Sequence, residues 1–167
     1  MKMKYCPQCR ATLIGKHIDG NQRFVCSNDL CCFVHWKNPV PVVVAIVEYS
    51  GQYVIARNRV WSNGVFSLIS GYLEQGEAPE HAVLREVQEE LNLDATIGEF
   101  IGHYIYAKKN QLLLCYEVQA CGVLKLNHEL VEYKLLTAET LAKYDFSPLT
   151  LTTEIISDWW KAQNRPS

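Results

Sequence analysis

Residues 71–93, GYLEQGEAPEHAVLREVQEELNL, carry the pattern that decides the fold. We predict a helical segment that has Pro79 early in it, where its missing N–H costs little, and that runs to about Leu91. Three apolar residues recur at four-residue spacing and predict one buried face: Val83, Val87 and Leu91. Asn92 follows, and asparagine is one of the few non-glycine residues that tolerate a left-handed helix cap.

Three carboxylates lie on another face of this predicted helix. Glu86, Glu89 and Glu90 are spaced i, i+3 and i+4, which places them side by side. Because like charges repel, such a cluster does not favour folding by itself, whereas a hard cation such as Mg²⁺ prefers oxygen ligands. Arg85 can offset charge or orient a carboxylate through its rigid fork of donors. The alternative is a solvated acidic face of a surface helix.

The segment resembles the Nudix box, G-x5-E-x7-R-E-U-x-E-E-x-G-U, in which U is apolar. The residues that match in register are Gly71, Glu77, Arg85, Glu86, Val87, Glu89, Glu90 and Leu93. Asn92 stands where the family has glycine, and asparagine is the next-best residue for that backbone conformation. All the carboxylates of the box are present, whereas a non-catalytic box normally loses some.

The resemblance implies an α/β fold, the Nudix α/β/α sandwich with a mixed β-sheet, and a hydrolase that binds Mg²⁺ or Mn²⁺. Glu86 and Glu90 would be direct metal ligands, and the Ser70 carbonyl would be a further one. Glu89 would be another ligand or part of the proton-accepting apparatus. Bound ions would neutralise a diphosphate, lower the pKa of a water and stabilise the leaving oxygen.

The resemblance also assigns roles to other charged residues. Glu77 would hold a water on the metal or brace the loop, and Arg85 would orient a catalytic glutamate. Residues 127–132 resemble the stretch that supplies one more acidic ligand in zinc-ribbon members, with Glu129 as candidate and Glu132 in reserve. The alternative is that both are surface glutamates. The identity of the general base differs between family members and stays open.

Strand-like and helix-like segments surround the box. Val40–Tyr49 is β-branched, which is typical of a strand buried on both faces, and residues 52–56 are its predicted antiparallel partner. Residues 65–69 are predicted to form a strand that breaks at Gly71. Further strands are predicted at 95–107 and 112–118, and closing helices at 138–144 and 150–162.

The first 32 residues hold five of the seven cysteines. Cys6 and Cys9 form a CxxC knuckle, and Cys26 and Cys31 form an irregular second one. Two knuckles separated by about 15–20 residues hold Zn²⁺ tetrahedrally and can fold a segment too small to own a core. A redox pair or a lost metal site is the alternative.

The run that follows, CFVHWKNP, resembles the CGFVHYENP run that leads into a group of zinc-ribbon Nudix proteins. On that alignment Cys31 is the fourth ligand, and Cys32 or His35 could substitute for it. We therefore predict a zinc ribbon at 1–35 and a Nudix hydrolase domain at 36–167. The remaining two cysteines, Cys115 and Cys121, are predicted to be core thiols.

Composition and charge limit the expected partners. Six of the 16 Lys/Arg but two of the 18 Asp/Glu lie in residues 1–40, so the remainder is acidic. A net charge of −2 provides no global attraction to nucleic acid, which is not expected as a partner. No apolar signal core is visible, and the longest apolar run is far shorter than the roughly 20 residues that span a bilayer. We expect a cytoplasmic protein with no membrane partner.

Together the two motifs resemble NADH pyrophosphatases and related ADP-ribose and FAD diphosphatases. NADH pyrophosphatases carry an SQPWPFPxS motif after the box, and no such motif follows Leu93. We therefore favour other dinucleotides or ADP-sugars over NAD(H) as the substrate. We expect a small-molecule nucleotide substrate, a nucleoside diphosphate linked to another group, to be cleaved at its diphosphate. The alternatives are a non-catalytic nucleotide sensor and an RNA-directed protein whose ribbon grips the strand.

Substrate-binding residues carry no signature. Tyr104, Tyr106 and Trp61 could stack on a base, although aromatic residues in strands more often belong to a core. Oligomeric state is also open. Nudix proteins are often homodimers, and Val40–Tyr49 with Trp159 and Trp160 could serve either a core or an interface.

Overall fold

The computed structural model describes residues 3–164. They form two compact units that meet in the sequence between Asn38 and Pro39. The domain boundary predicted after residue 35 lies slightly earlier in the chain. Each unit has its own sheet and its own buried residues.

The first unit, which we call the ribbon, is an antiparallel sheet of β1 (Leu13–Ile18), β2 (Asn21–Cys26) and β3 (Val34–His35). Asp19 and Gly20 make the hairpin turn between β1 and β2, and their φ angles of 48° and 76° suit a two-residue turn that follows the strand twist. The buried residues of the described ribbon are Cys6, Leu13 and Cys26. A core of this size does not stabilise a domain, so another source of stability is needed.

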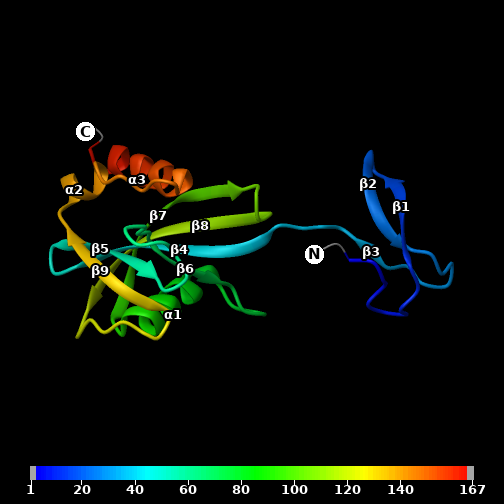
Figure 1. Ribbon diagram of the computed structural model, residues 1–167, viewed down its shortest axis with the longest axis horizontal. Helices are drawn as coiled ribbons and strands as arrows, with labels where there is room; N and C mark the ends of the chain where they lie inside the picture. Colours follow the sequence, from blue (N-terminus) through cyan, green and yellow to red (C-terminus); the bar gives the residue numbers. More distant parts are fainter. Residues whose placement is uncertain (1–2, 165–167) are drawn as a thin grey trace. The chain divides into compact units, whose positions relative to one another are not determined.

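The second unit, the body, is a six-stranded sheet with helices on both faces (Figure 1). The strand order is β7-β8-β4-β5-β9, with β6 also paired to β4. Strand β4 runs parallel to β8 and antiparallel to β5 and β6, so the sheet is mixed. The strands are β4 (Val40–Tyr49), β5 (Gln52–Asn58), β6 (Ile69–Tyr72), β7 (Asp94–Tyr106), β8 (Gln111–Cys121) and β9 (Leu130–Leu136). The predicted α/β/α sandwich with a mixed sheet is confirmed.

Strand β4 is buried on both faces, as predicted. Its odd-numbered residues 43–47 pack in the cluster that contains the apolar face of α1 (Pro79–Leu91). Its even-numbered residues 42–46 pack in the cluster that contains Ile155, Ile156 and Trp159 of α3 (Thr150–Gln163). Because side chains alternate along a strand, β4 separates two hydrophobic layers. A short helix, α2 (Ala138–Ala142), precedes α3.

Helix α1 begins and ends as predicted. Pro79 lies in its first turn, and Val83, Val87 and Leu91 are buried. Asn92 adopts a left-handed conformation (φ 57°, ψ 33°), and its N–H donates to the carbonyl of Gln88. Asparagine therefore fills the glycine position of the box at little cost.

Two predictions about the sheet and its cysteines are wrong. The strand predicted at 65–69 is instead β6 (Ile69–Tyr72), which passes through Gly71 without a break, and in the predicted stretch Ser67 makes an isolated bridge to Ala56. Phe66 and Leu68 are buried as loop side chains, which accounts for the apolar pattern. Cys115 is a core thiol, but Cys121 is exposed because it is the last residue of β8.

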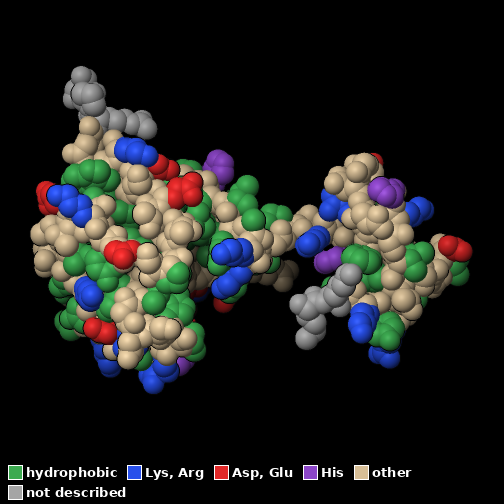
Figure 2. All heavy atoms as spheres, turned by 45° about the horizontal axis from the view of Figure 1, so that its top comes forward, with side chains coloured by type: hydrophobic (Ala, Val, Ile, Leu, Met, Phe, Trp, Pro, Cys, Tyr) green, Lys and Arg blue, Asp and Glu red, His purple; other side chains and the backbone are tan. Residues whose placement is uncertain are grey.

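Charge is divided unequally between the units. Described residues 3–38 contain five Lys/Arg and two Asp/Glu, whereas residues 39–164 contain nine and sixteen. Lys and Arg side chains are visible on the surface of the ribbon (Figure 2). Within residues 3–164, no helix is long and apolar enough to cross a membrane.

Candidate functional site

Arg85 is the centre of the carboxylate site. Its Nε and Nη2 donate to the two oxygens of Glu77 at 2.8 and 2.9 Å, and its Nη1 donates to Glu86 at 2.8 Å and to Glu89 at 3.1 Å. Nη2 also donates to the carbonyl of Tyr72 at 3.0 Å. One guanidinium thereby joins the loop, the end of β6 and two turns of α1, using the fixed fork geometry that lysine lacks.

Glu77 is held in place by hydrogen bonds from Arg85 and from the loop that precedes α1. Besides Arg85, its Oε2 accepts from the backbone N–H of Glu74 at 3.0 Å. The hydrogen bonds from Arg85, followed by that from Glu74, lower the pKa of Glu77 to about 2. Both carboxylate oxygens thus have protein donors, a geometry suited to bracing the loop.

Gly71 faces the carboxyl group of Glu86 across the space between β6 and α1. A Cβ at this position would overlap the Glu86 carboxyl carbon and both its oxygens. The close approach of Glu86 therefore favours glycine at the start of the box. Backbone conformation is not the reason, because the φ of Gly71 is not in the left-handed region. Burial raises the pKa of Glu86, and Arg85 partly offsets that rise.

Glu90 is the buried acid of the group, with 9% of its surface exposed. Its pKa is raised to about 8, first by burial and then by the charges of Glu86, Glu129 and Glu89. The ion pairs of Arg85 reach Glu77, Glu86 and Glu89 and do not include Glu90. A cation that is not part of the chain would strongly stabilise the charged form of a carboxyl group in this position.

The burial of Glu90 depends on the segment after β8. The N–H groups of Lys125 and Asn127 donate to the carbonyls of Leu91 and Glu90 at 2.9 and 3.1 Å. These bonds satisfy carbonyls that the end of a helix leaves free, and they bring the chain over the last turn of α1. Glu129 follows directly and lies close enough to raise the pKa of both Glu86 and Glu90.

The two acidic candidates beyond the box have different surroundings. Glu129 has a side chain 55% exposed, and His128 lies 4.0 Å away. Glu132 is paired with Arg57 at 3.1 Å on neighbouring strands. Ser70, whose carbonyl is the other predicted ligand, lies in β6 directly before Gly71. Proximity to Glu90 therefore favours Glu129 over Glu132.

The carboxylates are less tightly gathered than the cysteines. Within residues 3–164 a single group of His, Cys, Asp or Glu has all its ligand atoms within 4.8 Å of one another: Cys6, Cys9, Cys26 and Cys31. The described glutamates form no such group. Their roles as metal ligands stay predictions.

The cysteine cluster brings two knuckles together. The sulfurs of Cys6 and Cys31 are 3.7 Å apart, and those of Cys9 and Cys26 are 3.3 Å apart. Cys32 is exposed and outside the group. The N–H of Ala11 is the main cause that lowers the pKa of Cys9 to about 7. The backbone N–H of Asn28 lowers the pKa of Cys26, but burial and the other three cysteines raise it to about 12.

The three aromatic residues considered for base stacking differ in their burial. Tyr104 is buried and its hydroxyl donates to Asp158 at 3.3 Å, whereas Tyr106 and Trp61 are half-buried. Next to the box, Tyr72 has an exposed ring (58% exposed) that no sequence prediction named. Its hydroxyl accepts from Gln111 at 3.0 Å and its carbonyl binds Arg85. Alternation in β6 from Gly71 could have placed it on the sheet face opposite Glu86.

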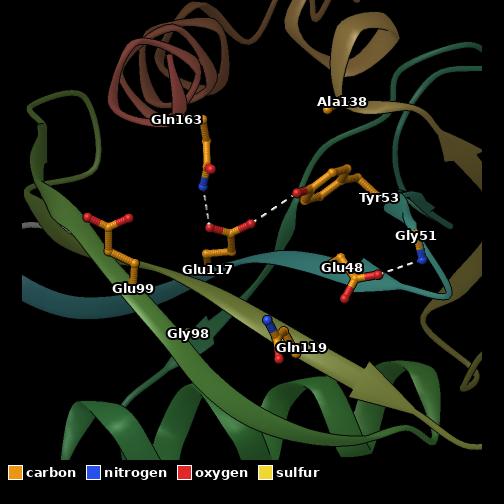
Figure 3. A pocket seen from close by; sticks show the side chains of 9 residues that line it. All are labelled: Glu48, Gly51, Tyr53, Gly98, Glu99, Glu117, Gln119, Ala138 and Gln163. Atoms are coloured by element: carbon orange, nitrogen blue, oxygen red, sulfur yellow. Dashed lines mark hydrogen bonds between the residues drawn. The ribbon is translucent and has the colours of Figure 1, made fainter. Parts of the chain in front are cut away.

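A separate open cleft of about 570 Å³ lies elsewhere in the body (Figure 3). Its centre is Glu117, which accepts from Tyr53 at 3.1 Å and from Gln163 at 2.9 Å. Glu48 and Glu99 add negative charge to the lining, and no box residue contributes to it. The cleft is therefore not the catalytic site predicted from the box.

Replacing Gly71 with alanine is expected to displace the Glu86 carboxylate. The added methyl group overlaps the end of a flexible side chain, so the fold should persist while Glu86 moves by about 1 Å or more. We expect kcat to fall by on the order of a hundredfold, because a misplacement of about 1 Å in a catalytic site can cost about that much. The melting temperature should stay within a few degrees. Ser70→Ala, which keeps the backbone carbonyl, is the matched control, and an unchanged kcat in Gly71→Ala would contradict the role of Glu86.

The family model for the NUDIX domain matches residues 37–153. The match covers the body's sheet, the carboxylate helix and α2 and ends in the first turn of α3, so the chain belongs to the NUDIX domain family. It is similar to the NAD-capped RNA hydrolase NudC of Vibrio atlanticus, with 27% identity over 120 residues, which cover 72% of this chain and 43% of that protein.

A mammalian relative is the mitochondrial NAD(P)H pyrophosphatase NUDT13 of Mus musculus, with 23% identity over 137 residues. That match covers 81% of this chain and 37% of the relative. The chain thus spans less than half of the length of these two curated relatives. Their activities belong to longer proteins.

Solved structures show the same fold. A NUDIX hydrolase from Nitrosomonas europaea has a TM-score of 0.79 at 20% identity, covering 99% of this chain and 96% of that one. An ADP-ribose pyrophosphatase from Streptococcus suis has a TM-score of 0.60 at 18% identity, covering 78% and 96%. At these identities the likeness concerns the fold alone.

Proposed function

We propose that this chain hydrolyses the diphosphate bond of a nucleoside diphosphate linked to a second group, with a divalent cation at the carboxylate site. The observation that carries the proposal is the arrangement around Arg85. One guanidinium holds Glu77, Glu86 and Glu89, while Glu90 stays buried beside them without an ion pair to it. Membership of the NUDIX domain family supports the same chemistry.

The residues fit a hard divalent cation. Glu86, Glu90, Glu129 and the Ser70 carbonyl offer oxygen ligands, which Mg²⁺ and Mn²⁺ prefer. The raised pKa of Glu90 fits as well, since a nearby cation would stabilise its charged form. When bound, such a cation would neutralise the diphosphate, lower the pKa of a water and stabilise the leaving oxygen.

The protein groups divide into holding and positioning roles. Glu86 and Glu90 are the proposed direct ligands, and Arg85 positions Glu86 and Glu89 through two hydrogen bonds from Nη1. Glu77 braces the loop, because its two oxygens are occupied by Arg85 and the Glu74 N–H. Glu89 remains more exposed than its neighbours and can accept a proton or complete the ligand set. The general base is Glu89 or another of these glutamates.

We propose that the ribbon holds structural Zn²⁺ through Cys6, Cys9, Cys26 and Cys31. Four sulfurs within 4.8 Å of one another match a closed tetrahedral site, which leaves no position for a substrate. The pKa of Cys9 is lowered and that of Cys26 is raised. A doubly charged cation would stabilise the thiolate form of all four cysteines. The geometry favours Cys31 over Cys32 as the fourth ligand.

The proposed substrates follow the relatives and the site. Relatives are described as acting on NAD-capped RNA and NAD(P)H, and a structural neighbour as acting on ADP-ribose. All three contain a nucleoside joined through a diphosphate to a second group. The ring of Tyr72 is exposed on the face of β6 opposite Glu86, and it is a candidate surface on which a base of such a substrate could stack.

A substrate panel tests this function. Purified protein with Mg²⁺ is incubated with ADP-ribose, FAD, NADH, nucleotide sugars, dinucleoside polyphosphates and 5′-NAD-capped RNA, and products are separated by chromatography. We expect at least one compound to yield two phosphate-terminated products. If no compound is cleaved but one binds, the protein is a nucleotide sensor and the hydrolase proposal is wrong.

A further inference from the structure

One face of the ribbon sheet is open and carries both cations and apolar surface. In the β1–β2 register Ile14 lies opposite Val25 and Lys16 opposite Arg23, so these four side chains share a face. The opposite face carries Leu13 and Cys26, which belong to the buried cluster of the cysteine site. We call the first face the outer ribbon face: Ile14, Lys16, Ile18, Arg23, Val25, Val34 and Trp36.

Two like charges stand directly opposite each other on the outer ribbon face. Lys16 and Arg23 are cross-strand partners, an arrangement that destabilises a sheet when nothing compensates it. Neither residue takes part in an ion pair among the described residues. The Nη1 of Arg23 donates to the Trp36 carbonyl, and its Nε is buried without a hydrogen-bond partner. The pair therefore favours an anion on this face.

An aromatic ring lies beside the two cations. Trp36 is 46% exposed, and the guanidinium of Arg23 lies 5.6 Å from its ring centre. Ile14 is 49% exposed at the other end of the same face. Exposed apolar groups interleaved with cations suit a polyanion that also offers flat, apolar rings, and single-stranded nucleic acid has both features.

We propose that the outer ribbon face binds single-stranded RNA, with phosphates at Lys16 and Arg23 and a base stacked at Trp36. This inference rests on the proposed function, because it makes the ribbon the holder of the RNA whose capped 5′ end the body would cleave. Charge complementarity selects the ribbon for this role. The described body has sixteen acidic against nine basic residues, whereas the ribbon has two against five. The positive ribbon therefore attracts RNA, and the negative body repels it.

The binding test uses the full chain and a fluorescent 12-nucleotide single-stranded RNA, followed by anisotropy at several salt concentrations. We expect Lys16→Glu to weaken binding about tenfold and to reduce the slope of log K against log salt by roughly one contact. Trp36→Ala should also weaken binding about tenfold but leave the salt slope unchanged, because stacking releases no counterions. Lys143→Glu, an exposed body residue with the same charge change, is the matched control.

A second readout separates this inference from the proposed function. Both ribbon variants should cleave a small substrate, such as ADP-ribose, at the wild-type rate, yet cleave the capped 12-mer more slowly at subsaturating concentration. Zinc content and thermal unfolding verify that each ribbon is folded. Equal RNA binding by wild type and both variants would overturn the inference, as would equal binding of duplex RNA or of an acidic peptide with the same charge. Failure to cleave any substrate would instead overturn the proposed function, because RNA binding is measured independently.

Discussion

Glu90→Gln is expected to abolish hydrolysis of every substrate that the wild type cleaves. The substitution keeps the shape of the side chain but removes the buried charge that we propose binds the cation. We expect kcat/KM to fall by at least about a thousandfold, which corresponds to roughly 4 kcal/mol of transition-state stabilisation. Glu139→Gln, an exposed residue of α2, makes the same chemical change away from the site and should retain full activity.

The same variant is expected to be more stable than the wild type when divalent cations are chelated. The folded-state pKa of Glu90 is raised from 4.5 to about 8, so the native state keeps a proton that the unfolded chain has already lost between these pH values. The free energy of unfolding of the wild type therefore falls as pH rises through this window. Glutamine does not ionise and avoids that loss. At pH 8 we expect an advantage of about 2–4 kcal/mol and a melting temperature several degrees higher.

Differential scanning calorimetry at pH 5 and pH 8 with EDTA measures this effect. The advantage of Glu90→Gln should be small at pH 5 and large at pH 8. Addition of Mg²⁺ at pH 8 should stabilise the wild type more than the variant, because binding to the native state adds to its stability. A variant advantage that is the same at both pH values would show that Glu90 does not titrate in this range. Lower activity combined with higher stability is the result that distinguishes a functional charge from a structural one.

Cys31→Ser is expected to unfold the ribbon and leave the body intact. The described ribbon has three buried core residues, too few to stabilise a domain, and we propose that bound Zn²⁺ supplies most of the remaining stability. Zinc binding to such sites supplies about 10–16 kcal/mol, and loss of one thiolate removes much of that. We expect zinc content to fall from about one ion per chain to near zero, with collapse of the ribbon amide signals in NMR spectra. Hydrolysis of a small nucleotide should stay within about twofold.

Cys32→Ser is the matched control for this prediction. Cys32 is the next residue in the chain, but its sulfur lies outside the cluster and its side chain is exposed. We expect full zinc content and an unchanged NMR spectrum. If instead Cys32→Ser loses zinc and Cys31→Ser retains it, the assignment of the fourth ligand is wrong. If neither loses zinc, the four-cysteine site is wrong.

Local spacing was enough to predict the carboxylate helix and the cysteine knuckles. The i, i+3 and i+4 spacing of Glu86, Glu89 and Glu90 sets their common side of α1, because the helix repeat is fixed at 3.6 residues. The ends of α1 were also predictable, since Pro79 and Asn92 act through their own backbone preferences. The β-branched run of β4 indicated a strand buried on both faces because only a central strand requires that composition.

Non-local contacts decided the remaining features. The burial of Glu90 depends on Lys125 and Asn127, which lie more than 30 residues away and close the end of α1. The shift of the predicted 65–69 strand to β6 reflects pairing with β4, while Phe66 and Leu68 are buried from a loop. Apolar character reports burial, but it does not show whether a buried residue lies in a strand or a loop.

Spacing within short segments was sufficient to predict the class of protein and the helix that carries the carboxylates, and to name the candidate metal ligands. The choice between alternative residues needed the packing of the whole chain. That packing gathered Cys31 rather than Cys32, placed Glu129 rather than Glu132 near Glu90, and exposed Tyr72 beside Arg85. Each of these choices depends on how separate segments pack, and the spacing of residues along one segment contains no measure of the distance to another.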